Sequence, residues 1–355
     1  SNMESAGVVR LVSLIEQNVS SVRRECGTSV TVMVKADAYG HGMTRVARAL
    51  RGYADAFGVA TTEEGVKLRR DGITEDILVA LCDGAELERA AEFGLTVGVA
   101  DFGTLNVLRD IAASGCKIPR FHIKTDTGMH RLGFLPSEVG TVCGLLDEAG
   151  LSPQGFYSHL RSCNDAQINT FAFLREKLKA RYPGAVFHLA SSSALDREDA
   201  LFDAVRIGHA AYEGAMRVES TVVAAKQLNR AEGLGYGDFR TTSACNVAWV
   251  FGGYFDGICR ENASSVLIRG RLCPPVGSVC MDMFAVDTGD FVADKGENVV
   301  LLGDSLTAER VAEQRKTCDY AVMTAWRGRT ERIYTDDETR GEEDCGGACR
   351  EDERR

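Results

Sequence analysis

Apolar residues in the first two thirds of the chain come in short runs that alternate with longer amphipathic stretches. The eight runs span residues 31–36, 56–60, 77–81, 96–100, 120–125, 155–160, 186–191 and 204–208. Segments between them, such as TTEEGVKLRRDG and NTFAFLREKLKARY, have helical periodicity, with Asp or Thr near their starts and Gly just past their ends. Continuous apolar strands that alternate with helices are typical of a parallel sheet covered on both faces. Eight such units predict a (β/α)8 barrel of the TIM type, with an open doubly wound sheet as the alternative.

The pattern changes after about Gly214, where strand-like runs such as NVAWVFGGYF and ENVVLLG follow one another with few helices between them. This indicates a barrel over residues 8–214 and a mainly β domain over residues 215–334. The apolar segment 8–14 precedes the first barrel unit and is expected to add a strand to the β domain. Residues 335–355 are charged and almost without apolar side chains, which predicts a disordered tail.

Composition restricts the class of partner. The 355 residues are 45% hydrophobic and carry a net charge of -10, which argues against a nucleic-acid or anionic-membrane surface and favours small molecules or proteins as partners. No apolar run approaches the roughly 20 residues of a membrane span, and the first residues do not resemble a signal peptide, so we expect a cytoplasmic protein. The twelve cysteines are too dilute for a disulfide scaffold, and Cys345 and Cys349 lack a second ligand pair for zinc. We expect no metal.

Reactive side chains recur where the predicted strands end, which is where barrel enzymes build their sites. They are Lys35 after the first run, Arg131 after the fifth, His159 in the sixth, Ser191 and Ser192 in the seventh and Arg206 in the eighth. A lysine at the end of an apolar run either extends its amine to water or uses it, for example in a Schiff base. Any one of these residues alone is most simply structural. Together they favour a shared site and a Schiff-base role for Lys35.

An ordered set of motifs identifies a family resemblance. The motifs are VKADAYGHG, KTDTGMHRLGF, SH at 158–159, HLASS, RIG, GYG, GGYFDG, VGSVCMD and DY at 319–320. In this order and spacing they resemble those of the alanine racemase family, fold-type III pyridoxal-phosphate amino-acid racemases, across residues 8–334. Ser191 and His209 depart from the family pattern, where an asparagine and a small apolar residue are usual.

The resemblance implies that pyridoxal 5'-phosphate is bound covalently to Lys35. It also implies a set of phosphate ligands, namely Tyr39, Ser192, the backbone amides of Gly208 and His209, and Tyr320. Hydroxyls and loop amides suit an anion because they offer several hydrogen bonds without a nearby lysine. Arg206 is implied to face the pyridine nitrogen, where a fixed positive charge disfavours ring protonation.

The resemblance further implies a two-base reaction in a homodimer with shared active sites. Lys35 serves one face of the substrate, and Tyr236 of the partner subunit serves the other. A tyrosine needs nearby positive charge to act as a base near neutral pH, and His159 and Arg206 are implied to supply it. Tyr254 matches a different tyrosine, which lines the substrate entrance.

The substrate carboxylate is implied to bind Arg131 and the backbone amide of Met281, beside Asp282. Lys124 matches a lysine that is often carbamylated and that orients this arginine. Tyr320 is implied to narrow the space beside the substrate side chain, so we expect L-alanine to D-alanine racemisation with measurable serine activity. A role in D-alanine supply for peptidoglycan, in catabolism or in resistance stays open.

Several alternatives stay open at this point. A serine racemase would share every motif, and a fold-type III decarboxylase would share the architecture, although its glycine-rich phosphate loop and catalytic cysteine have no convincing match. A non-catalytic cofactor-binding barrel would need only one domain. A purely structural protein would have no reason to place Lys35, His159 and Arg206 at strand ends.

Overall fold

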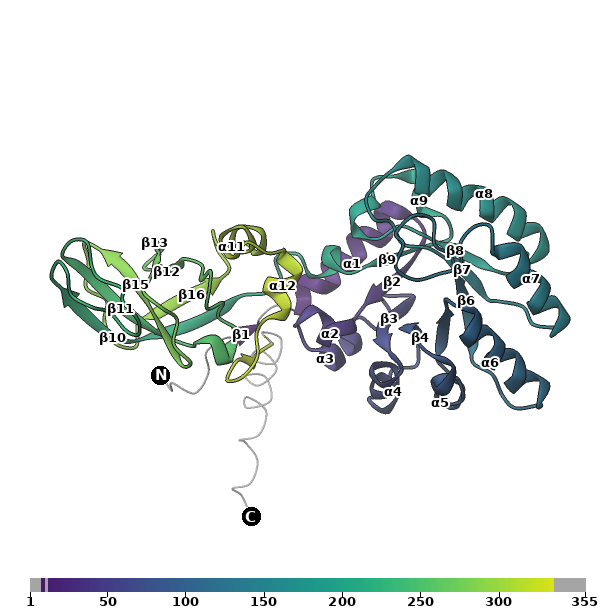
Figure 1. Cartoon of the computed structure of the whole chain (residues 1–355), viewed down its shortest axis with the longest axis horizontal. Coiled ribbons are helices and arrows are strands. Elements are labelled where there is room, and N and C mark those ends of the chain that lie inside the picture. Colours follow the sequence, from purple (N-terminus) through teal and green to yellow (C-terminus); the bar gives the residue numbers. More distant parts are fainter. Residues whose placement is uncertain (1–7, 10–11, 335–355) are drawn as a thin grey trace, which may run out of the picture. The chain divides into compact units, whose positions relative to one another are not determined.

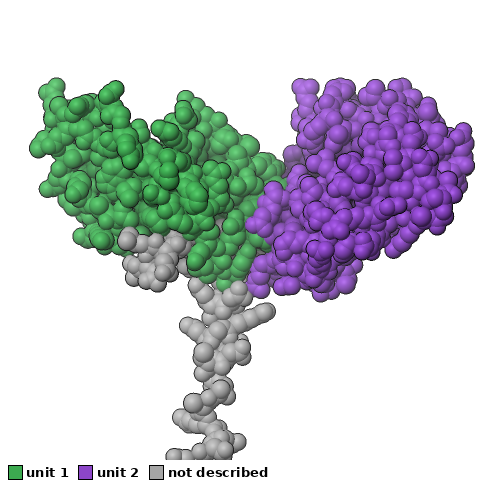
Figure 2. All heavy atoms as spheres, turned by 60° about the horizontal axis from the view of Figure 1, so that its bottom comes forward, with its two compact units in different colours: residues 1–15, 39–42, 212–355 green, residues 16–38, 43–211 purple. Residues whose placement is uncertain are grey.

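The computed structural model describes residues 8–9 and 12–334, so the expectation for residues 335–355 lies outside the described residues. The chain divides into two compact units, which Figure 2 colours separately. The barrel unit comprises residues 16–38 and 43–211, and the sheet unit comprises residues 1–15, 39–42 and 212–355.

The barrel unit contains eight parallel strands that close on themselves in chain order, β2 to β9 (Figure 1). The strands are β2 (Ser29–Met33), β3 (Ala56–Thr61), β4 (Asp76–Leu81), β5 (Thr96–Val99), β6 (Arg120–Lys124), β7 (Gly155–Tyr157), β8 (Val186–His188) and β9 (Ala204–Ile207). Strand β9 pairs with β2 to close the ring, with Thr31 opposite Arg206. The predicted (β/α)8 barrel is confirmed, and the open-sheet alternative is wrong.

Helices connect the barrel strands. They are α1 (Val12–Cys26), α3 (Met43–Ala49), α4 (Thr62–Arg70), α5 (Leu87–Glu92), α6 (Phe102–Ala113), α7 (Val139–Glu148), α8 (Asp165–Arg181), α9 (Glu198–Leu201) and α10 (His209–Tyr212). Side chains cap three of them: Thr61, Asp101 and Asn164 each accept a hydrogen bond from the backbone amide three residues later. These caps fix where the helices begin, because the first amides of a helix have no partner within it.

The sheet unit is built on a seven-stranded antiparallel sheet in the order β13-β12-β16-β10-β11-β15-β14. The strands are β10 (Val218–Leu228), β11 (Cys245–Phe251), β12 (Val266–Ile268), β13 (Arg271–Cys273), β14 (Pro275–Val276), β15 (Met283–Gly289) and β16 (Asn298–Leu302). Helices α11 (Ala308–Arg315) and α12 (Asp319–Thr324) follow. Leu234, Val247 and Ala285 form a buried cluster beneath one part of the sheet.

Part of the segment 8–14 forms a strand. Val8–Val9 are strand β1, which pairs in parallel with β17 (Glu331–Arg332) as a two-stranded sheet within the sheet unit. Residues 12–14 already belong to helix α1. None of the helices within the described residues is long and apolar enough to cross a membrane.

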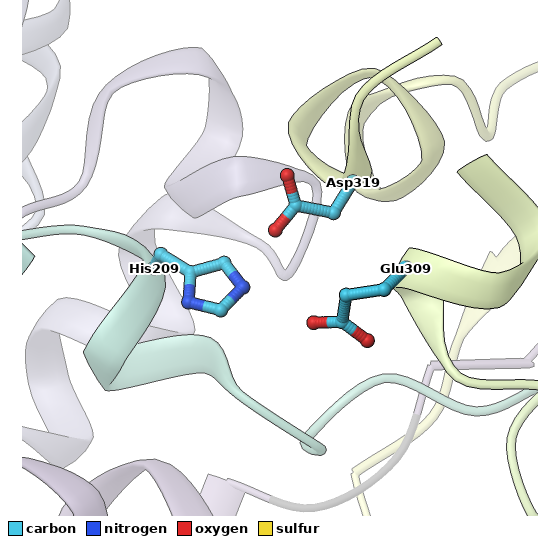
Figure 3. A group of neighbouring side chains, drawn as sticks. All are labelled: His209, Glu309 and Asp319. Carbon is cyan, nitrogen blue, oxygen red and sulfur yellow. The ribbon is translucent and has the colours of Figure 1, made fainter. Parts of the chain in front are cut away.

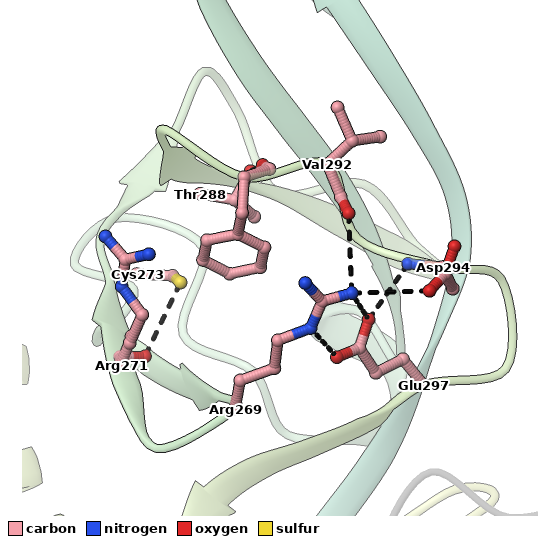
Figure 4. Close-up of polar contacts among 8 residues, drawn as sticks. Arg269, Arg271, Cys273, Thr288, Val292, Asp294 and Glu297 are labelled. Atoms are coloured by element: carbon pink, nitrogen blue, oxygen red, sulfur yellow. Dashed lines mark hydrogen bonds and ion pairs between the residues drawn. The ribbon is translucent and has the colours of Figure 1, made fainter.

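The hairpin of β12 and β13 is fastened by arginines (Figure 4). Arg269 forms ion pairs with Asp294 at 3.3 Å and with Glu297 at 2.5 Å. The guanidinium carbons of Arg269 and Arg271 lie 4.9 and 5.0 Å from the centre of the Phe291 ring. Both guanidiniums thus contact the same aromatic ring, and Arg269 is also held by its two ion pairs. These contacts stabilise the hairpin at the edge of the sheet.

Candidate active site

Basic side chains from several strands converge at one end of the barrel unit. Burial, followed by the charges of Arg131 and Arg206, lowers the pKa of Lys35. Burial lowers the pKa of His159 to about 3, and the charges of Arg206, Arg131, Lys124 and Lys35 add to this shift. These five residues are therefore near neighbours, and His159 is neutral near pH 7. A group of amines and guanidiniums this dense favours an anionic ligand and an unprotonated Lys35.

Lys35 stands two residues after the end of β2, at the start of a short helical turn, α2 (Lys35–Tyr39), that is left-handed. The φ angles of Ala36, Asp37, Ala38 and Tyr39 lie between 51° and 54°. This conformation costs each L-residue roughly 1–2 kcal/mol, so four in succession must be held by their surroundings. The Asp37 carboxylate supplies one such contact, because it accepts a hydrogen bond from the Met43 amide at 2.8 Å.

Glu64, in the first turn of α4, supplies another contact. Its carboxylate accepts backbone hydrogen bonds from Ala36 and Ala60, while burial raises its pKa. The same carboxylate raises the pKa of Lys35, in opposition to the neighbouring arginines. Glu64 thus holds the left-handed turn and is the acidic group that faces the Lys35 amine.

Arg206 is the most deeply anchored of the basic residues, with 6% of its surface exposed. Its NH1 atom donates to the backbone carbonyl of His188 at 3.1 Å, and NH2 donates to the carbonyls of Ser158 at 2.6 Å and Leu189 at 3.3 Å. NH1 also lies 2.6 Å from Nδ1 of His188. These contacts occupy the terminal nitrogens and leave Nε–H without a partner among the described residues.

Lys124 ends β6 and is 6% exposed. Its Nζ atom lies 5.6 Å from the centre of the Tyr157 ring. Burial, followed by the charges of Arg206, Arg131 and Lys35, lowers its pKa to about 8. About a tenth of this amine is therefore unprotonated at pH 7, far more than for an ordinary lysine, and the unprotonated form is the one that reacts with carbon dioxide.

A cluster of hydrogen-bonding groups lies where β9 meets α10. The Ser192 hydroxyl oxygen accepts hydrogen bonds from the amides of Gly208 at 3.2 Å and Ala210 at 3.1 Å. The hydroxyl and two amides thus point at one small region. His209 begins α10 and lies between these two amides in the chain, and its own amide stays a predicted phosphate ligand.

In the sheet unit, Tyr39 packs between two other tyrosines. Its ring stacks on Tyr212 at 5.0 Å and lies 5.7 Å from Tyr320. Burial raises the pKa of Tyr39 to about 12, and burial followed by Asp319 raises that of Tyr320. Both hydroxyls therefore stay protonated at neutral pH and are able to donate to an anion.

Figure 3 shows the acidic residues near the start of the last two helices. Glu309 projects from α11 and Asp319 from α12, and both belong to the sheet unit. His209, also drawn there, belongs to the barrel unit. The Asp319 carboxylate accepts the Tyr320 amide at 3.0 Å and so fixes the start of α12.

The remaining predicted residues line a cleft of about 650 Å³ within the sheet unit. Tyr236, Tyr254, Met281 and Asp282 all contribute to its wall. Tyr236 is 73% exposed and Met281 is 53% exposed, which is unusual for large apolar side chains. The cleft therefore has the features of a surface that another molecule covers.

The packing at the floor of the cleft explains why the GGYFDG motif contains a glycine at position 253. A Cβ atom at Gly253 would lie 2.2 Å from the carbonyl oxygens of Cys280 and Met281, so only glycine fits. Arg329 pairs with Asp256 of the same motif at 2.8 Å and with Asp282 at 2.9 Å. These contacts hold the 280–282 loop in place.

Three residues of the site were missing from the sequence-based set: Glu64, His122 and His188. The last two lie on β6 and β8 and are buried inside the barrel. Strand alternation in RFHIK places His122 on the same face as Lys124, which is a signal that the sequence contained. Glu64 had no such signal, because only the fold brings α4 next to Lys35.

Comparisons with known proteins identify the family of the chain. A model of the alanine racemase N-terminal domain matches residues 12–215, and one of the C-terminal domain matches residues 215–334. An alanine racemase of Thermobifida fusca is 34% identical over 347 residues, which covers 88% of this chain and 93% of that protein.

Solved structures give the same result. An alanine racemase of Streptomyces coelicolor superposes with a TM-score of 0.86 at 28% identity, over 93% of this chain and 97% of that one. One from Bartonella henselae, with covalently bound pyridoxal phosphate, superposes with a TM-score of 0.85 at 25% identity, over 93% and 99% of the two chains. By its architecture and by sequence over nearly its whole length, the chain belongs to the alanine racemase family.

Proposed function

We propose that this enzyme racemises alanine with pyridoxal 5'-phosphate held at the mouth of the barrel. The observation that carries the proposal is the position of Lys35, two residues after the end of β2, with a pKa lowered by burial and by Arg131 and Arg206. A covalent cofactor link and a proton transfer both require an amine in its unprotonated form at a fixed place, and a lowered pKa favours that form.

The residues fit the cofactor at three points. Within the barrel unit, the Ser192 hydroxyl and the amides of Gly208 and Ala210 are donors that suit a phosphate. Within the sheet unit, the protonated hydroxyls of Tyr39 and Tyr320 are donors that suit the same kind of group. Arg206 retains one free N–H for the ring nitrogen. When bound, pyridoxal phosphate supplies the electron sink that makes the substrate α-hydrogen acidic.

The chain's own groups then move the proton. Lys35 Nζ takes or returns the α-proton on one face, and the hydroxyl of Tyr236 of the partner subunit does so on the other. Arg131 and the Met281 amide hold the substrate carboxylate, and a carbamate on Lys124 would orient Arg131. The exposed Tyr236 supports a homodimer with shared sites, because a base at the surface needs a second surface to work on.

Alanine is favoured over serine by the aromatic ring of Tyr320. An apolar wall accommodates a methyl group, but it rejects an added hydroxyl by only about a hundredfold. Serine is therefore the second candidate substrate, and a fold-type III decarboxylase is the alternative reaction.

The test combines chemistry with turnover. Reduction of the cofactor-loaded enzyme with labelled borohydride should remove its visible absorbance. The label should then be found on Lys35. L-alanine, D-alanine and L-serine should then be compared under initial-rate conditions with carbon dioxide measured in parallel. Interconversion of the alanine isomers without carbon dioxide is expected, whereas release of carbon dioxide would contradict the proposal.

A further inference from the structure

A pair of histidines lies inside the barrel directly against Arg206. Nδ1 of His122 is 2.8 Å from Nε2 of His188, and Nδ1 of His188 is 2.6 Å from NH1 of Arg206. The three residues come from β6, β8 and β9. All are at least 93% buried, since their exposed fractions are 7%, 4% and 6%.

Neighbouring residues leave space for the contacts between His122, His188 and Arg206 and hold these side chains in place. The Tyr157 ring stacks on His188 at 4.9 Å, with an angle of 2° between the rings. A Cβ atom at Gly155 would lie 2.8 Å from the His122 ring, and one at Gly98 would lie 2.1 Å from the Tyr157 hydroxyl. Two glycines thus provide the space that the aromatic stack occupies.

Hydrogen-bond chemistry decides where the protons lie. A guanidinium has only donors, so Nδ1 of His188 must accept from Arg206. A neutral imidazole that accepts at Nδ1 carries its hydrogen on Nε2, and this hydrogen is then donated to Nδ1 of His122. His122 in turn carries its hydrogen on Nε2. A proton added to His188 would face a buried guanidinium, at a high electrostatic cost.

We propose that His188 is a positioning residue for Arg206, and that His122 fixes the tautomer that allows it. The role rests on the proposed function, in which the remaining Nε–H of Arg206 meets the cofactor ring. In agreement, burial and then Arg206 and His122 place the pKa of His188 well below its ordinary value. Burial is also the main cause that lowers the pKa of His122 to about 4.

The tautomers are directly measurable on the loaded full-length enzyme labelled with 15N-histidine, because the chain has only six histidines. Variants His188→Asn and His122→Asn assign the signals. Both histidines are expected to be neutral with hydrogen on Nε2 from pH 6 to pH 8. A protonated Nδ1 on His188, or a doubly protonated ring at pH 7, would overturn the proposal whether or not the enzyme racemises alanine.

Two substitutions then separate positioning from packing. His188→Asn keeps an acceptor near the position of Nδ1, whereas His188→Leu fills similar space without one. The Leu variant should lose roughly ten- to a hundredfold in kcat/KM, as for a broken hydrogen bond to a charged group, and form more pyruvate per racemisation event. The Asn variant should recover most of both. Equal behaviour of the two variants would contradict the proposal, and if the Leu variant fails to fold, the tautomer measurement decides.

Discussion

The barrel mouth and the cleft of the sheet unit are prepared for chemistry in opposite ways. At the mouth, Arg206 is 6% exposed and its terminal nitrogens are fully bonded within the barrel. In the cleft, Tyr236 is 73% exposed. The first region is preorganised by its own fold, so its groups stay aligned during a reaction without a further reorganisation free energy. The second presents exposed groups, which under the proposed mechanism act on the site of a partner subunit.

The largest effect is expected from Lys35→Ala, which removes both the covalent link and one base. Racemisation in both directions should fall by at least about a thousandfold, because positioned general-base catalysis alone contributes 10²–10⁴. Loss of the visible absorbance of the loaded enzyme would accompany the loss of turnover. Lys67→Ala, which removes an exposed lysine of α4, is the matched control and should change neither.

Mixing variants tests whether the mouth and the cleft belong to different subunits of one site. Hybrids of a Lys35→Ala chain with a Tyr236→Phe chain should recover activity, since one of the two sites would then contain both bases. Verified hybrid dimers without recovery would show that the cleft does not complete a neighbour's site.

Tyr236→Phe should produce a smaller and one-sided loss. Exchange of the α-proton in deuterated solvent should slow about a hundredfold or more from L-alanine, while exchange from D-alanine continues through Lys35. Tyr254→Phe keeps the same cleft and serves as the control, with a milder effect on both isomers. Equal losses from the two isomers in Tyr236→Phe would refute the assignment of the base.

The pH dependence of stability should also distinguish a lysine at the barrel mouth from one in the sheet unit. Burial lowers the pKa of Lys124 to about 8, below its ordinary value, so the unfolded chain binds more protons between these pH values. The free energy of unfolding should therefore rise with pH from about 8 to 10.5, by roughly 1–3 kcal/mol for this group. Below pH 8 the group is protonated in both states and this slope disappears.

Urea denaturation across this pH range measures the slope. Lys124→Met should reduce it, whereas Lys226→Met, at an exposed position of β10, should leave it unchanged. Lys35 has a pKa lowered in the same direction and would account for any slope that remains. An unaltered slope in Lys124→Met would mean that Lys124 is carbamylated or solvated in the folded enzyme.

The smallest effect concerns specificity. Tyr320→Asn should shift the ratio of kcat/KM values towards serine by about tenfold, because an amide offers a hydrogen bond that the ring does not. Tyr320→Phe keeps the ring and loses only the hydroxyl, so cofactor affinity should fall while the ratio stays. If the wild type already uses serine as well as alanine, Tyr320 is not the selector.

The barrel was predictable because each of its strands contains a run of apolar residues. These runs reveal the number and the order of the strands. The strand-end positions of Lys35, His159 and Arg206 followed from the same pattern, since parallel strands deliver their last residues to one edge. The left-handed turn after Lys35 was not predictable, because alanines and an aspartate carry no signal for positive φ. Nor was the partnership of Glu64 with Ala36, which depends on how α4 packs. Motif resemblance contributed Tyr236, whose exposure the hydrophobic pattern alone would not have explained.

The turn from Ala36 to Tyr39 has a stereochemical consequence. Its four residues adopt the backbone conformation that D-amino acids favour, so this short segment is a mirror image of the helices around it. D-alanine placed at the exposed position 36 by semisynthesis would sit at its own energy minimum, where the natural L-alanine is strained. An enzyme proposed to interconvert the two hands of alanine thus carries, next to the lysine proposed to bind its cofactor, a stretch of chain where the opposite hand would fit better.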